Sequence, residues 1–148
     1  MSMYYIDISS REDNKEFMLE VVRKNGYYLN SISKRLRDDK DIVLAAIKEN
    51  GYVLKYASDR LKNDTDFAYT AIECDGINLK DLHERFYDDA VFMLKAIQKH
   101  TGAFQFSSER LKDDKEFILK ALNINLFFFL YISERLQKDN DISSLIND

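Results

Sequence analysis

The apolar and polar positions of this chain recur with a constant step of 25 residues. The phrase Ser-x-Arg-Leu begins at positions 33, 58, 108 and 133, and a diverged copy, His-Glu-Arg-Phe, begins at position 83. Four columns keep this register: a large apolar residue, an alanine, an arginine and an aspartate. The aspartate column holds Asp39, Asp64, Asp89, Asp114 and Asp139, and the arginine column holds Arg35, Arg60, Arg85, Arg110 and Arg135. Chance does not hold so many columns in phase, so the chain is a tandem repeat.

Each repeat predicts two short helices. The first begins after the aspartate column, whose carboxylate suits the unpaired N–H groups of a first helical turn, and it carries i, i+4 apolar pairs such as Ile42 and Ala46. We expect this helix to end where glycine supplies a left-handed residue, at Asn25-Gly26, Asn50-Gly51 and Asp75-Gly76. The second helix buries a narrower stripe that includes Leu54, Ala57 and Leu61.

A single repeat of this size cannot bury its apolar face, whereas stacked repeats can. The prediction is therefore an all-α protein: one domain, 1–148, folded as a short right-handed α-solenoid of 25-residue helical hairpins. Its repeats span about 8–32, 33–57, 58–82, 83–107 and 108–132, with a half-repeat at 133–148. The small alanine column marks where neighbouring helices approach most closely. The absence of proline and the presence of only four glycines agree, because strand-and-turn folds depend on both residues.

The repeat resembles a known family. Its pattern, Asp-x-Asp/Glu-Ile/Phe-Val-Leu-x-Ala-Ile-x-x-Asn-Gly-x-x-Leu-x-x-Ala-Ser-x-Arg-Leu, is clearest between Asp39 and Leu61 and is similar to a tandem short-helix repeat catalogued as a domain of unknown function. Members of that family are found in protists and in proteins secreted by intracellular bacteria. The resemblance, over about residues 13–142, implies a helical repeat fold and an effector-like setting but no activity. Thr101 and Leu126 depart from its glycine column.

Composition narrows the classes of function. A formal charge of −4 and a pI near 5.3 disfavour nucleic acid as the main partner, since phosphate binding needs a basic field. The longest apolar run, 126–132, is far shorter than the ~20 residues of a membrane-spanning helix. One cysteine and an N-terminus without a signal-peptide pattern favour the cytoplasm, or the cytosol of a host cell if the protein is an effector.

The sequence predicts no catalytic residue, no metal site and no cofactor, and we expect a protein that is not an enzyme. His83 and His100 lack a second ligand at helical spacing, and Cys74 lies outside any nucleophile motif. Paired acids such as Asp38-Asp39 lack the glycine-containing calcium loop, and helix capping explains them better. The arginine column suits either anion binding or structural pairing with acids of its own or an adjacent repeat; its recurrence in every repeat favours structural pairing.

Variable aromatic positions predict a partner-binding surface. The candidate residues are Tyr28, Tyr56, Phe106, Phe128, Leu130 and Tyr131. Phe128 and Leu130 replace mostly polar or small residues of sister repeats, so we expect them outside the inter-repeat core. They are covered either by the terminal half-repeat, around Ile142, Leu145 and Ile146, or by a partner.

These observations favour a non-catalytic helical-repeat module that binds another protein, in the family's setting an effector or an effector-accessory protein. A second copy of the chain is an alternative partner. Two other classes remain open: a nucleic-acid-binding solenoid that reads bases repeat by repeat, and a targeting fragment of a larger enzyme.

Overall fold

The computed structural model describes residues 6–74 and 79–147, which form only α-helices, 3₁₀ helices and loops. The all-α prediction is thus confirmed. The chain divides into two compact parts, Met1–His83 and Glu84–Asp148, and each part is a stack of repeats with its own core. The assignment of the whole chain to one domain stays a prediction.

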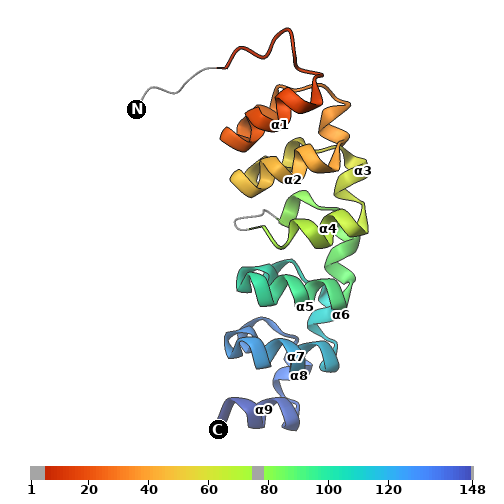
Figure 1. Ribbon diagram of the computed structural model, residues 1–148. Helices are drawn as coiled ribbons and strands as arrows, with labels where there is room; N and C mark the ends of the chain where they lie inside the picture. The colour runs from red at the N-terminus through yellow and green to blue at the C-terminus, as the bar shows by residue number, and fades with distance from the viewer. Residues whose placement is uncertain (1–5, 75–78, 148) are drawn as a thin grey trace. The chain divides into compact units, whose positions relative to one another are not determined.

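In the N-terminal part, three α-helices of successive repeats lie side by side, α1 against α2 and α2 against α4 (Figure 1). Its elements in chain order are α1 (Lys15–Lys24), η1 (Gly26–Asn30), η2 (Leu36–Asp38), α2 (Lys40–Glu49), η3 (Gly51–Tyr56), α3 (Asp59–Lys62), α4 (Thr65–Ala71) and η4 (Leu79–Asp81), where η denotes a 3₁₀ helix. The faces between these helices bury Ile42, Ile47 and Phe67 completely.

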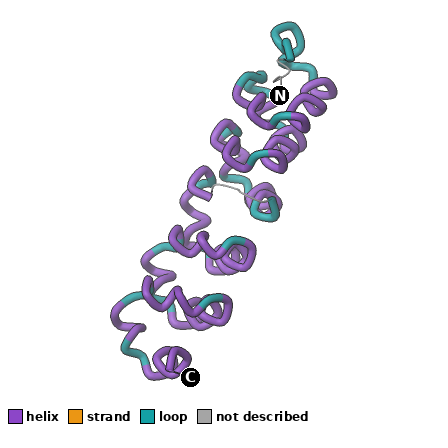
Figure 2. Tube along the Cα trace, turned by 90° about the vertical axis from the view of Figure 1, so that its left-hand side faces the viewer, coloured by secondary structure: helices purple, strands orange, loops and turns teal. Residues whose placement is uncertain are grey.

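The C-terminal part repeats the same plan, with α5 packed against α7. Its elements are η5 (Glu84–Asp88), α5 (Ala90–Lys99), η6 (Thr101–Phe106), α6 (Glu109–Lys112), α7 (Lys115–Ile124), η7 (Leu126–Tyr131), α8 (Glu134–Gln137) and α9 (Asn140–Asn147). Short loops join the helices throughout (Figure 2). The alanine column is buried as predicted, with Ala46, Ala71, Ala96 and Ala121 at most 1% exposed.

The aspartate column caps the long helix of each repeat, as predicted. The carboxylate of Asp64 accepts a hydrogen bond of 2.7 Å from the backbone N–H of Phe67, and Asp114 does the same for Phe117 at 3.0 Å. In the first repeat the side chain of Asn14 takes this place. Each cap satisfies a backbone donor that the helix itself leaves unpaired.

The second half of the repeat differs from the predicted continuous helix. Ala57 and Ser58 are extended, with ψ of 157° and 153°, and they separate η3 from the single turn of α3. The Oγ atom of Ser58 accepts a hydrogen bond from the backbone N–H of Leu61, so the serine is an N-cap that starts a new helix. Ser108 and Ser133 cap α6 and α8 in the same way.

Gly26 allows close packing between repeats, which corrects the prediction of a left-handed residue at this position. The preceding Asn25 is extended, and Gly26 is buried and does not have a left-handed backbone conformation. A Cβ atom on Gly26 would lie far inside van der Waals contact of the carbonyl oxygen of Ala46, in the next repeat. The pair Asp75-Gly76 lies outside the described residues.

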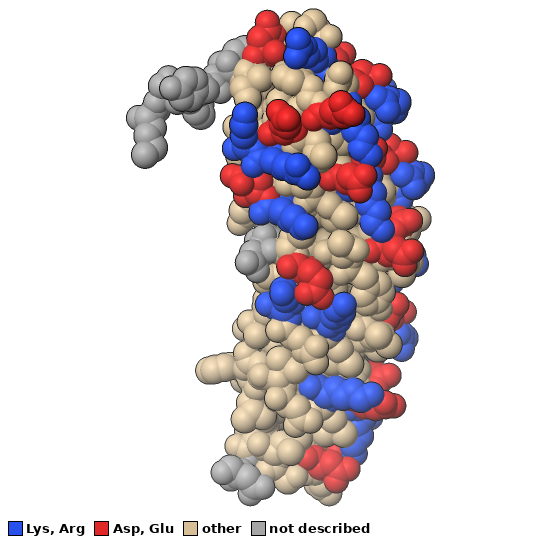
Figure 3. All heavy atoms as spheres, viewed as in Figure 1, with Lys and Arg blue, Asp and Glu red and all other residues tan. Residues whose placement is uncertain are grey.

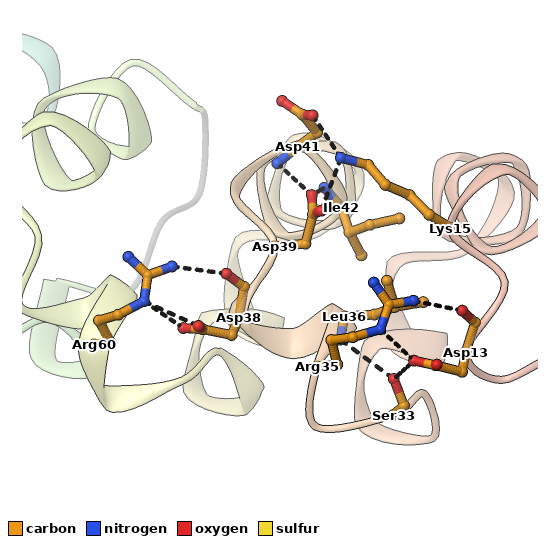
Figure 4. Close-up of polar contacts among 10 residues, drawn as sticks. All are labelled: Asp13, Lys15, Ser33, Arg35, Leu36, Asp38, Asp39, Asp41, Ile42 and Arg60. Carbon is orange, nitrogen blue, oxygen red and sulfur yellow. Dashed lines mark hydrogen bonds and ion pairs between the residues drawn. The ribbon is translucent and has the colours of Figure 1, made fainter.

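A hydrogen-bonded set of three side chains joins consecutive repeats, and we call it the latch. The aspartate before the capping residue of the long helix accepts hydrogen bonds from the serine and the arginine of the next Ser-x-Arg-Leu phrase. Figure 4 shows Asp13 with Ser33 and Arg35, and Asp38 with Arg60. The same arrangement joins Asp88 to Ser108 and Arg110, and Asp113 to Ser133 and Arg135.

The latch assigns structural roles to residues that looked alike in the sequence. Of the pair Asp38-Asp39, only Asp39 caps a helix, whereas the side chain of Asp38 binds the next repeat. The Nη2 atom of Arg60 also donates a hydrogen bond of 2.9 Å to the backbone carbonyl of Asp38. The predicted pairing of the arginine column with acids of an adjacent repeat is therefore confirmed at Arg35, Arg60, Arg110 and Arg135.

Lysines add a second contact between repeats at two places. The ammonium group of Lys15 lies 2.7 Å from the carboxylate of Asp39 and 2.9 Å from that of Asp41, so one cation ties α1 to the first turn of α2 (Figure 4). Lys115 makes the equivalent pairs with Asp139 and Asp141 at the start of α9.

Two glycines give a matched test of the packing. Gly26→Ala should lower the free energy of unfolding by about 1–3 kcal/mol, because the added methyl group overlaps the Ala46 carbonyl. Gly102→Ala should be neutral or slightly stabilising, because a Cβ atom there meets nothing within 4 Å. Urea denaturation of both variants measures this; equal effects at the two positions would contradict the role given to Gly26.

The latch predicts how stability depends on pH. Hydrogen bonds from serine and then arginine hold the pKa values of Asp13, Asp38, Asp88 and Asp113 below the ordinary 3.8. Because the pKa is depressed in the folded chain, this stabilisation is complete above about pH 5 and is lost as the pH falls through the folded-state pKa. Asp88→Asn should therefore melt below wild type at pH 7, with the difference vanishing near about pH 2.

Thermal melts followed by circular dichroism measure this difference, with Glu49→Gln as a charge-matched control at an exposed position. A melting difference between Asp88→Asn and wild type that stays constant from neutral to acid pH would contradict the role of the ionised carboxylate.

Candidate functional site

The structure places the six predicted partner-binding residues in different surroundings. Leu130 and Tyr131 are each 65% exposed, whereas Phe128 is 5% exposed. Tyr28, Tyr56 and Phe106 are half-buried.

The expectation that Phe128 lies outside the inter-repeat core is wrong. Its ring stacks on Phe104 of the preceding repeat, with centroids 4.3 Å apart and planes 7° from parallel. Val53 and Ala103, which hold the equivalent position in other repeats, are also buried. Phe128 therefore faces the preceding repeat, and the small side chains of Val53 and Ala103 lie in the interior of the protein instead of in solvent.

The three half-buried aromatic residues already have partners within the chain. The ring of Phe106 packs on Tyr87, with centroids 5.8 Å apart. The hydroxyl group of Tyr28 accepts a 2.7 Å hydrogen bond from the backbone N–H of Ile6, and Lys55 lies over the ring of Tyr56. These contacts leave Leu130 and Tyr131 as the two predicted residues that are most open to a partner.

Four exposed apolar side chains gather on η7, and we call them the η7 strip. They are Leu126, Phe127, Leu130 and Tyr131, which are 51%, 74%, 65% and 65% exposed. The prediction named only the last two. Phe127 could have been found from its column, because Tyr27 and Tyr52 stand at the equivalent position and are 53% and 63% exposed.

Beside the η7 strip lies an open groove of about 540 Å³, which we call the Gly102 groove. Its apolar lining consists of Phe104, Phe127, Phe128 and Tyr131. Its polar lining consists of Thr101, Gln105, Glu109, Lys112 and Asn125. Gly102 lies between these residues in the column that holds tyrosine at positions 27 and 52, and the space its missing side chain leaves is open.

The polar rim of the groove is mostly paired within itself. The ammonium group of Lys112 lies 2.9 Å from a carboxylate oxygen of Glu109. The side-chain amide of Gln105 donates a hydrogen bond to the Gly102 carbonyl. The side chain of Asn125 caps η7 by accepting a hydrogen bond from the N–H group of Phe127. The lining thus carries one positive and one negative charge that neutralise each other. On the face drawn in Figure 3, charged side chains are sparse over α7 and α9 and leave much of that surface uncharged.

The described residues offer little for catalysis. Among them, no group of three or more His, Cys, Asp or Glu side chains is placed to hold a metal ion. Cys74 is buried and His83 is exposed, with His100 half-buried. No helix in residues 6–74 or 79–147 combines the length and apolar character needed to cross a membrane. The expectation that the chain is not an enzyme stays a prediction.

Comparison with known proteins identifies the repeat. A family model with the description Domain of unknown function (DUF4116) matches three times in tandem, over residues 14–59, 39–87 and 92–142. The search of the curated proteins and the search of the solved structures gave no match. The matched segments cover most of the chain and overlap the capped helices and latches described above. The chain therefore belongs to the DUF4116 family, and the resemblance drawn from its repeat pattern is confirmed.

Proposed function

We propose that this chain is a non-catalytic module that binds another protein through the η7 strip. One observation carries the proposal: four large apolar side chains stand more than half exposed on a single 3₁₀ helix. Exposed apolar patches of this kind lower solubility, and in soluble proteins they mark interaction sites.

The chemistry of the strip suits protein recognition. Phe127, Tyr131 and two leucines supply aromatic and aliphatic surface without a charge, and aromatic residues are enriched at the centres of protein interfaces. Elsewhere in the chain, the position of Leu130 is held by Asn30, Lys55, Lys80 and Gln105. The fold of the other repeats therefore does not require a leucine at this position, and this supports a role for Leu130 in binding.

The remaining expectations about function rest on other grounds. The effector setting follows from the family resemblance alone and stays a prediction, as does the cytoplasmic location. The acidic balance of the chain and the uncharged strip favour a protein partner over nucleic acid, because nucleic-acid binding depends on Lys and Arg at the contact.

Polar substitutions in the η7 strip should weaken binding without destabilising the fold. In Leu130→Lys/Tyr131→Ser, each new residue is one that another repeat carries at the same position, as Lys55 and Ser31. A partner retained from cell lysate by the wild-type chain should bind this variant at least about tenfold more weakly, equal to ~1.4 kcal/mol. Its melting temperature should match wild type, because the replaced side chains are exposed.

Titration of the retained partner against immobilised chain measures the affinity. Tyr52→Ser removes an exposed aromatic side chain from another repeat and should leave binding unchanged. Full binding by the double variant, or a loss of binding that Tyr52→Ser shares, would contradict the proposal.

A further inference from the structure

We propose that the array breaks at its third step, between residues 63 and 85, so that the two parts 1–83 and 84–148 unfold independently of each other. The steps are counted from the N-terminus, and the third leads from the repeat that contains α4 to the repeat that contains α5. The proposal does not depend on the proposed function, because it concerns the coupling between repeats and not the η7 strip.

Two of the three latch residues are replaced at the third step. The other four steps all use an aspartate, a serine and an arginine. At the third step Asn63 stands at the aspartate position and His83 at the serine position, while Arg85 keeps the arginine. An amide carries no charge, so Asn63 cannot form an ion pair like the one of 2.9 Å between Asp38 and Arg60. Because charge-assisted hydrogen bonds are roughly twice as strong as neutral ones, the sequence provides a weaker latch here.

The replacement at position 83 also affects the start of the next helical turn. Ser58, Ser108 and Ser133 each accept a hydrogen bond from the backbone N–H group three residues later, and so cap the helix that follows. Histidine does not belong to the residue types that favour this position. The backbone N–H group of His83 still donates to the Lys62 carbonyl at 3.0 Å. The main chain therefore keeps its path at the third step, while the side chains that reinforce it elsewhere have changed.

A half-buried acid weakens the same repeat. Asp81 stands in the column that holds Tyr56 and Phe106 in the neighbouring repeats. The ring of Phe106 packs on Tyr87, with centroids 5.8 Å apart, whereas the Oδ2 atom of Asp81 is buried and has no hydrogen-bond partner among the described residues. The loss of hydration raises the pKa of Asp81 above the ordinary 3.8. Since a carboxylate oxygen buried without a hydrogen bond is costly, Asp81 lowers the stability of this repeat.

Two further features of the fold coincide with the third step. The helix α4 spans seven residues, whereas α2, α5 and α7 each span ten. The division of the chain into two compact parts falls between His83 and Glu84. In a linear array, each repeat is stabilised by its own contacts and by those with its nearest neighbours, so cooperative unfolding breaks where one step is weakest. The changed latch, the half-buried acid and the short helix place that point at the third step.

Urea unfolding of the full-length chain, followed by hydrogen–deuterium exchange and mass spectrometry of its peptides, tests the proposal. Gly26→Ala destabilises the first part and should lower the midpoint of peptides from 1–83 by on the order of 1 M urea, with no change for peptides from 84–148. Asn63→Asp/His83→Ser supplies the latch residues of the other steps. In that background, Gly26→Ala should lower the midpoints of both parts. Asp81→Phe, which introduces the residue found at position 106, should raise the midpoint of 1–83 alone.

Three outcomes would overturn the proposal. An equal fall of both midpoints in Gly26→Ala alone would show that the array unfolds as one unit. Parts that stay independent in the Asn63→Asp/His83→Ser background would show that the latch residues do not set the break. The matched control, Asp38→Asn/Ser58→His, gives the second step the residues of the third and should lower the midpoint of 1–83; an unchanged midpoint there would show that these residues do not decide the strength of a step.

Discussion

The stacking of repeats depends on one backbone hydrogen bond that recurs at every step. The N–H group that begins each Ser-x-Arg-Leu phrase donates to a carbonyl 21 residues earlier, as from Ser58 to Arg37 at 2.9 Å and from Ser108 to Tyr87 at 2.8 Å. His83 makes the same bond to Lys62, although histidine has replaced the serine there. Since the bond uses only main-chain atoms, it tolerates this divergence, and the latch of serine, aspartate and arginine reinforces it where those side chains are present.

The sequence was sufficient for the period and the helical class because both are carried by side-chain identity. Buried apolar columns, capping aspartates and pairing arginines recur visibly. The conformation of the main chain is harder to predict from the sequence. Ser58 separates two helical segments by capping the second one. Gly26 is required because a neighbouring carbonyl lies close to it, not because of its own dihedral angles. Asp38 and Asp39 differ in role because the capping residue is fixed by helix geometry, which leaves its neighbour to face the next repeat.

The candidate site was less predictable for a related reason. A position that varies between small and polar residues suggests exposure to solvent, but Val53 and Ala103 are buried, and the ring of Phe128 is buried against Phe104. Burial of the Phe128 column and exposure of the Leu130 column are set by the turn of η7, and a 3₁₀ helix of this length is not signalled by apolar spacing. The groove is lined by residues of η6, α6 and η7, and the columns of the sequence do not show that these residues lie together.

Stability and recognition therefore use different atoms of the same repeat. Caps, latches and the buried columns hold the stack together, and none of them uses a side chain at the outward positions 27, 52, 102 and 127. A residue at one of these positions can change from tyrosine to glycine to phenylalanine with little effect on folding, because its side chain makes no inter-repeat contact of the kind that fixes Gly26 or Ala46. This outward column therefore varies, and in the C-terminal part the exposed Phe127 follows one repeat after Gly102. Phe127 and Gly102 both line the aromatic groove there, whereas the first two repeats present the exposed side chains of Tyr27 and Tyr52 at the same position.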